Sequence, residues 1–255
     1  MQKINKLKHR HITSFQIIIL GFLSVILLGS LFLMLPIATK DGQITPFSDA
    51  LFTATSVVCV TGLVIYDTAT YWSFFGQCII LLLIQIGGMG IVTIFIAVAV
   101  VSGQKIGLMQ RSTMQEAIAA PTINGIVRKT EFIIKTVVLI ELIGAAILAP
   151  VFCRDFGFWK GIWYSLFHSI SAFCNAGFDL MGIKEPFSSI TSYSTQPIVN
   201  MTIMALIIVG GIGFLTWEDI KNNKWNFKKY RMQSKVILSV TALLIVLPTL
   251  YFFFF

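Results

Sequence analysis

The chain has 255 residues, of which 56% are apolar and 12% charged, with a formal net charge of +8. An ordinary soluble domain is about 25% charged, so this composition excludes a typical soluble protein and indicates that the bilayer is the solvent. The positive charge does not indicate nucleic-acid binding, because no basic helix or aromatic–basic module accompanies it.

Five apolar runs are each long enough to cross about 30 Å of hydrocarbon as a helix. They are Phe15–Pro36, Phe74–Val101, Thr130–Phe152, Gln196–Trp217 and Gln233–Phe255. The first run follows basic residues, as a signal peptide does, but its 22 residues and the lack of a small-residue cleavage site predict a retained anchor.

The basic residues are distributed unevenly between the connections. Fifteen of the 19 Lys and Arg lie before the first run, or in and next to the connections between the second and third runs and between the fourth and fifth. The positive-inside rule then places the N-terminus and these connections in the cytoplasm. Within residues 102–129, the stretch Leu108–Ala117 is predicted to form a helix near the membrane surface.

A three-part pattern occurs twice: an apolar run, a short Ser/Thr/aromatic segment ending in Cys-x-x-Gly, and an apolar run with a glycine cluster. Leu51 to Gly62 and Leu166 to Gly177 match at an offset of 115 residues, and the clusters Gly87–Gly90 and Gly210–Gly213 follow at an offset of 123. A repeat of this kind predicts duplicated architecture.

The short segment in each unit is too short to span the membrane. The first covers Pro46–Val58, with Pro46 expected in the first helical turn and Thr45 as cap. The second covers Phe158–Phe173. Irregular backbone at membrane depth is allowed only where it lines a water-filled path or is buried in protein. A surface amphipathic helix is the alternative, which the recurrence disfavours.

These features together predict an all-α membrane protein built from tandem helix–pore-loop–helix repeats. Two repeats are complete, and a third is represented by its first helix. The expected units are residues 1–101 and 130–217 for the repeats, 102–129 and 218–232 for cytoplasmic connections, and 233–255 for the additional helix.

In a pore loop, backbone carbonyls replace the hydration shell of the ion. The candidate potassium ligands are therefore the carbonyls of eight residues: Cys59, Val60, Thr61, Gly62, Cys174, Asn175, Ala176 and Gly177. Pore helices also direct their partially negative C-termini toward a cation. Cys59 and Cys174 occupy the same repeat position and allow two interpretations. They form a disulfide, or they are small buried residues beside a narrow path.

Several polar residues allow two interpretations. Glu141, inside the third run, either lines or couples the path or contacts a polar group of a neighbouring helix. His168 is a metal ligand or a packed side chain. Asp67 and Asp179 concentrate cations at the outer mouth or are ordinary loop carboxylates. The two glycine clusters provide close helix packing or a hinge.

At these residues the sequence resembles the Trk/Ktr/HKT superfamily of potassium transporters, most closely the membrane subunit of bacterial Ktr systems. The motifs are Phe52–Ser56 with Val60–Leu63, Ser169–Phe178, and the glycine clusters. The resemblance implies four tandem repeats with one filter glycine each, here Gly62 and Gly177.

The same resemblance implies a bacterial plasma-membrane homodimer on a cytoplasmic ring of nucleotide-binding regulatory subunits. Potassium is the expected ion, with sodium dependence in some members, and no covalently bound cofactor is expected. No protease, hydrolase or paired-carboxylate motif indicates an enzyme.

The expected function is the pore-forming subunit of a potassium uptake system. Because the resemblance implies four repeats, we expect the chain to be a truncated product. The alternative is a non-conducting membrane fragment that needs a separately supplied second half.

Overall fold

The structure is a computed structural model that describes residues 13–90, 93, 107–117, 125–183, 185–224 and 226–254. Throughout these ranges the regular elements are helical, which confirms the predicted all-α fold. The helices of at least four residues are α1 (Ser14–Leu33), α2 (Phe47–Val58), α3 (Thr68–Tyr71), α4 (Phe74–Met89), α6 (Leu108–Ala117), α7 (Ile126–Phe156), α8 (Phe158–Phe173), α9 (Pro197–Gly211), α10 (Phe214–Asn223) and α11 (Met232–Phe254).

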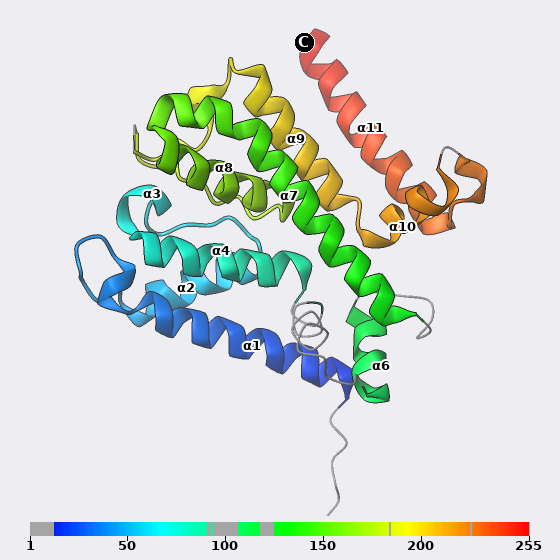
Figure 1. The fold of residues 1–255 in the computed structure, drawn as a ribbon, viewed down its shortest axis with the longest axis horizontal. Helices are drawn as coiled ribbons and strands as arrows, with labels where there is room; N and C mark the ends of the chain where they lie inside the picture. Colours follow the sequence, from blue (N-terminus) through cyan, green and yellow to red (C-terminus); the bar gives the residue numbers. More distant parts are fainter. Residues whose placement is uncertain are drawn as a thin grey trace, which may run out of the picture.

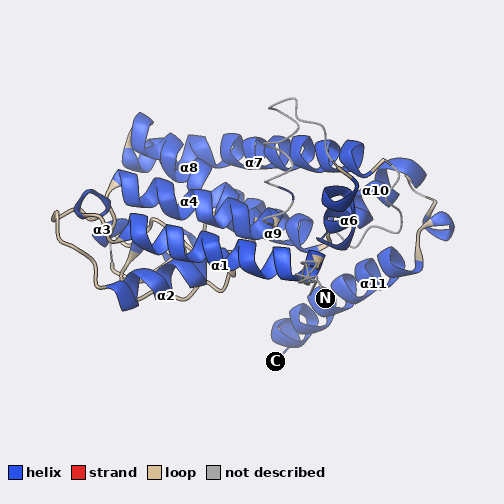
Figure 2. Ribbon diagram, turned by 90° about the horizontal axis from the view of Figure 1, so that it is seen from below, coloured by secondary structure: helices blue, strands red, loops and turns tan. Residues whose placement is uncertain are grey.

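The helices form two groups with a similar arrangement. In the first, the short α2 packs against α1 and α4, and in the second α8 packs against α7 and α9. The groups meet where α4 contacts α8, and α11 projects away from both (Figure 1; Figure 2). In each group the predicted pore helix thus packs against the helices before and after it, as expected for the predicted repeat.

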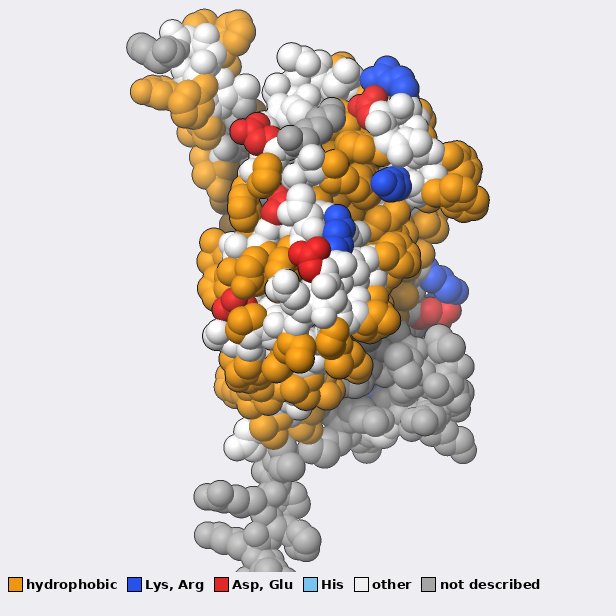
Figure 3. All heavy atoms as spheres, turned by 90° about the vertical axis from the view of Figure 1, so that its left-hand side faces the viewer, with side chains coloured by type: hydrophobic (Ala, Val, Ile, Leu, Met, Phe, Trp, Pro, Cys, Tyr) orange, Lys and Arg blue, Asp and Glu red, His pale blue; other side chains and the backbone are white. Residues whose placement is uncertain are grey.

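The apolar runs form three helices that are long and apolar enough to cross a membrane, or four if α9 and α10 count as one span. Large hydrophobic side chains remain exposed along them, and in the end-on view of Figure 3 hydrophobic side chains surround the scattered charged ones. None of the apolar window of α11 is buried. Such exposure is favourable only in lipid, so the chain is a multi-pass membrane protein.

Two predicted spans differ from the helices observed. The prediction of one continuous span over Gln196–Trp217 is wrong, because α9 and α10 meet at an angle of 93°. The helix breaks at Gly213, whose φ is +80°. Gly90 has the same φ and ends α4, and most of the predicted continuation to Val101 lies outside the described residues. Glycine adopts this backbone conformation readily.

The beginning of α2 also differs from expectation. Pro46 is the N-cap residue, not a residue of the first turn, and its backbone is extended with ψ 141°. Thr45 does not cap the helix, because its hydroxyl forms a hydrogen bond with the Tyr71 hydroxyl at 3.0 Å. The tertiary contact is available only because the segment before α4 folds back over the start of α2.

Other boundaries follow the sequence closely. The predicted bounds of α6 and α8 are confirmed. The third predicted span, Thr130–Phe152, forms α7, which is about one turn longer at each end. Gly157, with φ +82°, separates α7 from α8. The N-terminal basic residues used for the topology lie outside the described residues.

Candidate ion-binding loops

In each candidate loop the second residue after the pore helix has a left-handed backbone conformation. Val60 has φ +50° after α2, and Asn175 has φ +57° after α8. Gly62 and Gly177 follow with φ +75° and +73°. The sequence predicted unusual backbone conformation at the glycines but not at Val60 and Asn175. Asn tolerates this conformation, whereas a β-branched Val pays about 1–2 kcal/mol, so nothing at Val60 signalled it.

A serine in the last turns of each pore helix fixes the loop that follows. The Ser56 hydroxyl donates to the Leu63 carbonyl at 2.7 Å, and the Ser171 hydroxyl donates to the Phe178 carbonyl at 2.6 Å. Leu63 N–H also donates to the Ser56 hydroxyl at 3.0 Å. The two serine hydroxyls each donate to the carbonyl seven residues further along the chain, so each loop is held to its own pore helix in the same way.

A backbone hydrogen bond repeats this equivalence. The Thr61 N–H donates to the Ser56 carbonyl at 2.9 Å, and the Ala176 N–H donates to the Ser171 carbonyl at 2.8 Å. These bonds turn the N–H groups of the loop toward the pore helix. Among the described residues, no hydrogen bond reaches the carbonyl of any of the eight candidate ligands. These oxygens are the atoms that could coordinate a cation.

The two loops come together at their glycines. A β-carbon added to Gly62 would lie 3.0 Å from the Ala176 carbonyl oxygen and 3.3 Å from the Gly177 Cα. One added to Gly177 would lie 3.2 Å from the Gly62 Cα. The tertiary structure therefore places side by side two glycines that are 115 residues apart in the sequence. A side chain at either position would enter the space between the loops.

The glycine clusters hold the inner helices against the pore helices. A β-carbon on Gly87 would overlap the Val58 carbonyl oxygen, and one on Gly210 would overlap the Phe173 carbonyl oxygen. Val58 and Phe173 are the last residues of α2 and α8. The interpretation as close packing is thus confirmed. The last glycine of each cluster, Gly90 or Gly213, lies just beyond the end of the inner helix and has φ +80°.

Glu141 is buried between the two groups of helices. The Gln85 side-chain amide donates to both Glu141 carboxylate oxygens, at 3.0 and 3.1 Å. The Ser169 hydroxyl donates to the Glu141 backbone carbonyl at 2.7 Å, and the Cys174 thiol lies 4.0 Å from the Gln85 side-chain oxygen. The contact with a neighbouring polar group is therefore the correct interpretation. It ties α4 of one group to α7 of the other, behind the second loop.

Replacing Glu141 by leucine is expected to lower the free energy of unfolding by about 1–3 kcal/mol, because the half-buried Gln85 amide loses its acceptor. The control is Glu131→Leu on the same helix, since Glu131 is exposed and, among the described residues, forms its one ion pair with Lys135. Thermal unfolding of the purified protein in detergent measures both. Equal midpoints for the two variants would contradict the proposed link.

His168 is a packed side chain. Leu180 N–H donates to its Nε2 at 3.3 Å, so Nδ1 carries the proton and donates to the Tyr164 carbonyl at 2.7 Å. Both ring nitrogens are occupied. Across the described residues no group of three His, Cys, Asp or Glu could hold a metal ion. The histidine instead braces the outer part of the second loop.

The two carboxylates near the outer mouth, Asp67 and Asp179, have different environments. Asp67 is buried and accepts from the Phe187 N–H at 2.9 Å, so it is a structural loop carboxylate. Asp179 is half-buried, accepts from the Met181 N–H at 2.9 Å, and borders a cavity beside Asn175.

Cys59 is exposed and Cys174 buried, and neither forms a disulfide. The interpretation of these two cysteines as a disulfide is therefore wrong.

Residues 2–254 match the family described as TrkH, cation transport protein. The chain belongs to this family. It is 42% identical over 246 residues to the potassium/sodium uptake protein NtpJ of Enterococcus hirae, an alignment that covers 96% of the chain and 53% of the relative.

Two further relatives carry the name Ktr system potassium uptake protein B. The Bacillus subtilis protein is 40% identical over 246 residues, with 96% of the chain and 53% of the relative covered. The Vibrio alginolyticus protein is 34% identical over 238 residues, with 93% and 51% covered. The chain thus spans about half the length of the curated relatives it matches.

Proposed function

We propose that this chain provides pore-forming segments of a potassium uptake protein, with sodium as a possible second ion. The observation that carries the proposal is the meeting of two equivalent loops whose eight candidate carbonyls accept no hydrogen bond from the described residues. The uptake names of the relatives support potassium and sodium as the ions.

The proposed mechanism is passive. A cation sheds water as the carbonyls of Cys59–Gly62 and Cys174–Gly177 replace its hydration shell. The C-terminal ends of α2 and α8 contribute partial negative charge at the same point. The ion then moves down its electrochemical gradient past the glycine-bearing ends of α4 and α9. Selectivity is modest, because one short loop per repeat supplies few ordered carbonyl layers.

The surroundings of this pore are part of the same proposal. The protein lies in the bacterial plasma membrane with its N-terminus in the cytoplasm, as the distribution of Lys and Arg indicates. A homodimer and a cytoplasmic nucleotide-binding regulatory subunit follow from the family resemblance. The Ktr system names of two relatives support an assembly of several subunits.

The test is rubidium uptake in cells that lack their own potassium uptake systems. The chain is expressed alone, joined to the remainder of the Enterococcus hirae relative, or together with that remainder as a separate polypeptide. Gly62→Ser and Gly177→Ser are expected to reduce uptake by the joined form about tenfold or more, equivalent to about 1.4 kcal/mol of added barrier.

Gly42→Ser is the matched control. Gly42 also has positive φ, +68°, but an added β-carbon there meets nothing within 4 Å, so uptake should persist. Unchanged uptake in both filter variants would refute the pore assignment. Uptake only when the remainder is supplied, joined or separate, indicates a fragment that does not conduct by itself.

A further inference from the structure

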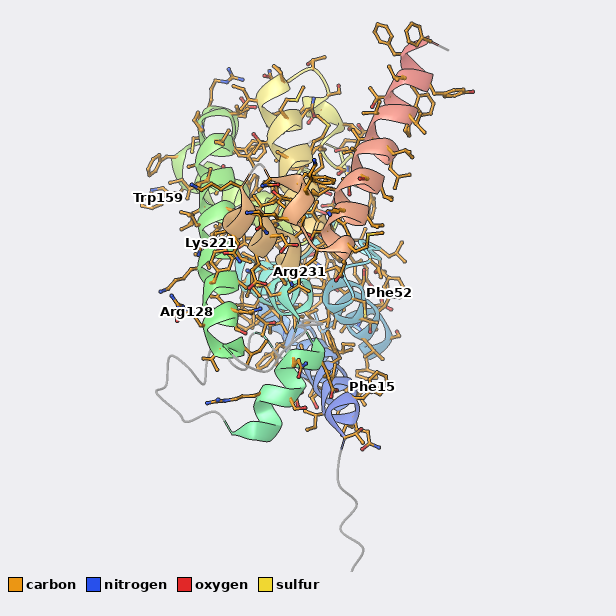
Figure 4. All side chains as sticks on the ribbon, turned by 90° about the vertical axis from the view of Figure 1, so that its right-hand side faces the viewer. Phe15, Phe52, Arg128, Trp159, Lys221 and Arg231 are labelled. Atoms are coloured by element: carbon orange, nitrogen blue, oxygen red, sulfur yellow. The ribbon has the colours of Figure 1, made fainter. Side chains whose placement is uncertain are left out.

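A cavity of about 390 Å³ lies between the first turns of α7 and the helix α10. Its lining includes three cationic residues, one anionic residue and a phenylalanine, namely Arg128, Lys129, Lys221, Glu218 and Phe132. Figure 4 shows Arg128 and Lys221 pointing to the same side of the molecule. We call this cavity the α7–α10 pocket.

The single carboxylate of the pocket is already neutralised. Glu218 is paired with Lys129 at 3.0 Å and with Arg231 at 2.5 Å. Arg128 and Lys221 are exposed and form no ion pair with any described residue. The Lys221 ammonium lies 4.0 Å above the centre of the Phe132 ring, which holds it at the pocket. Two cations from different helices therefore remain available to an anion.

The backbone adds positive potential at the same place. α7 has 31 residues and starts after Gly125 without a side-chain cap or an acidic residue in its first turn. Its first N–H groups have no acceptor within the helix, and its dipole favours an anion there. With the two side chains, this arrangement suits a phosphate group.

The other walls distinguish a lipid from a soluble anion. Phe132 lies at the pocket and Leu139 lies two turns further along α7, with Lys135 and Thr136 between them. Leu139 and Leu142, which are 58% and 54% exposed, begin an apolar stripe of the helix. This lipid-facing stripe starts about two turns beyond the pocket, on the side toward the centre of the membrane.

We propose that the α7–α10 pocket binds an anionic phospholipid of the cytoplasmic leaflet. Its phosphate bridges Arg128 and Lys221, and an acyl chain follows the stripe along Leu139. Basic pockets of this kind on the cytoplasmic side bind anionic headgroups in membrane proteins. Because α10 continues the inner helix after the break at Gly213, the lipid would fasten that continuation to α7. This inference does not depend on ion conduction.

The purified protein is titrated with phosphatidylglycerol or phosphatidylcholine, and bound lipid is counted by native mass spectrometry. Phosphatidylglycerol should bind more tightly. Each of Arg128→Gln and Lys221→Gln should weaken its binding about fivefold, and the double variant about 30-fold, at the usual contribution of one basic residue near a charged membrane surface. Arg128→Lys with Lys221→Arg should retain binding, which separates loss of charge from misfolding.

The matched control is Lys229→Gln with Lys235→Gln, two basic residues outside the pocket, and it should leave binding unchanged. Equal losses in both double variants would reduce the effect to general surface charge and overturn the proposal. Unchanged binding in Arg128→Gln with Lys221→Gln overturns it too. Displacement of the lipid by excess glycerol 3-phosphate would instead identify a soluble anion and reject the lipid.

Discussion

Gly210→Ala is expected to lower the free energy of unfolding by about 3 kcal/mol, near the upper end of the usual cost of overpacking. The new methyl group would overlap the carbonyl oxygen of Phe173, which belongs to the backbone at the end of α8. A backbone atom cannot rotate away as a side chain can. Either α9 or the start of the second candidate loop must therefore move. The thermal unfolding midpoint in detergent measures the loss.

Gly211→Ala is the adjacent control, because the nearest atom to its added methyl group is the Asn175 side-chain nitrogen at 3.9 Å. Alanine favours a helix over glycine by about 1 kcal/mol, so this variant should be neutral or slightly stabilising. Gly87→Ala should reproduce the loss in the first repeat, where the methyl group would overlap the Val58 carbonyl oxygen. Similar midpoints for Gly210→Ala and Gly211→Ala would show that α9 does not pack closely on α8.

Asp67→Ala is expected to cost about 3 kcal/mol, because a buried carboxylate with several donors is removed and hydrogen bonds to charged groups contribute about 1.5–3 kcal/mol. Asp67 accepts from the Thr70 N–H at 2.9 Å and from the Phe187 N–H at 2.9 Å. The first bond caps α3, and the second joins the outer loops of the two repeats. Both N–H groups lose their acceptor in the variant.

Limited proteolysis of the outer loops and thermal unfolding together measure this effect. Cleavage near Phe187 should become faster, because the loop loses its link to the first repeat. Asp41→Ala is the control, since Asp41 is an exposed loop carboxylate. If the Asp67 and Asp41 variants unfold and are cleaved alike, the link between the outer loops contributes nothing to stability.

The candidate loops are supported from three directions. Each is closed on its pore helix by a serine, Ser56 or Ser171. The inner helices press on the ends of the pore helices at Gly87 and Gly210. The pair Gln85–Glu141 connects the repeats behind the second loop. Support from these three directions holds the unbonded carbonyls in one arrangement, the one in which we propose that they coordinate the ion.

Much of this arrangement could be predicted from particular residues. Length and hydropathy located the pore helix Phe158–Phe173, and the structure has the same bounds. The 115-residue offset paired Ser56 with Ser171, which make equivalent bonds. The role of Glu141 stayed open, because one sequence does not show that Gln85 of another helix faces it. The left-handed Val60 was missed, because local preference opposes it and tertiary contacts override that preference.

Hydropathy, segment length and repetition act along the chain, so the membrane environment, the helical fold and the positions of the two loops could be predicted from the residues alone. Three features are visible only in the folded chain: Gly62 meets Gly177, the fourth span bends at Gly213, and Arg128 and Lys221 face one pocket. These facts depend on contacts between residues far apart in sequence. Which of these contacts form depends on which helices pack together. The hydrophobic periodicity of one sequence identifies the helices but not their packing partners.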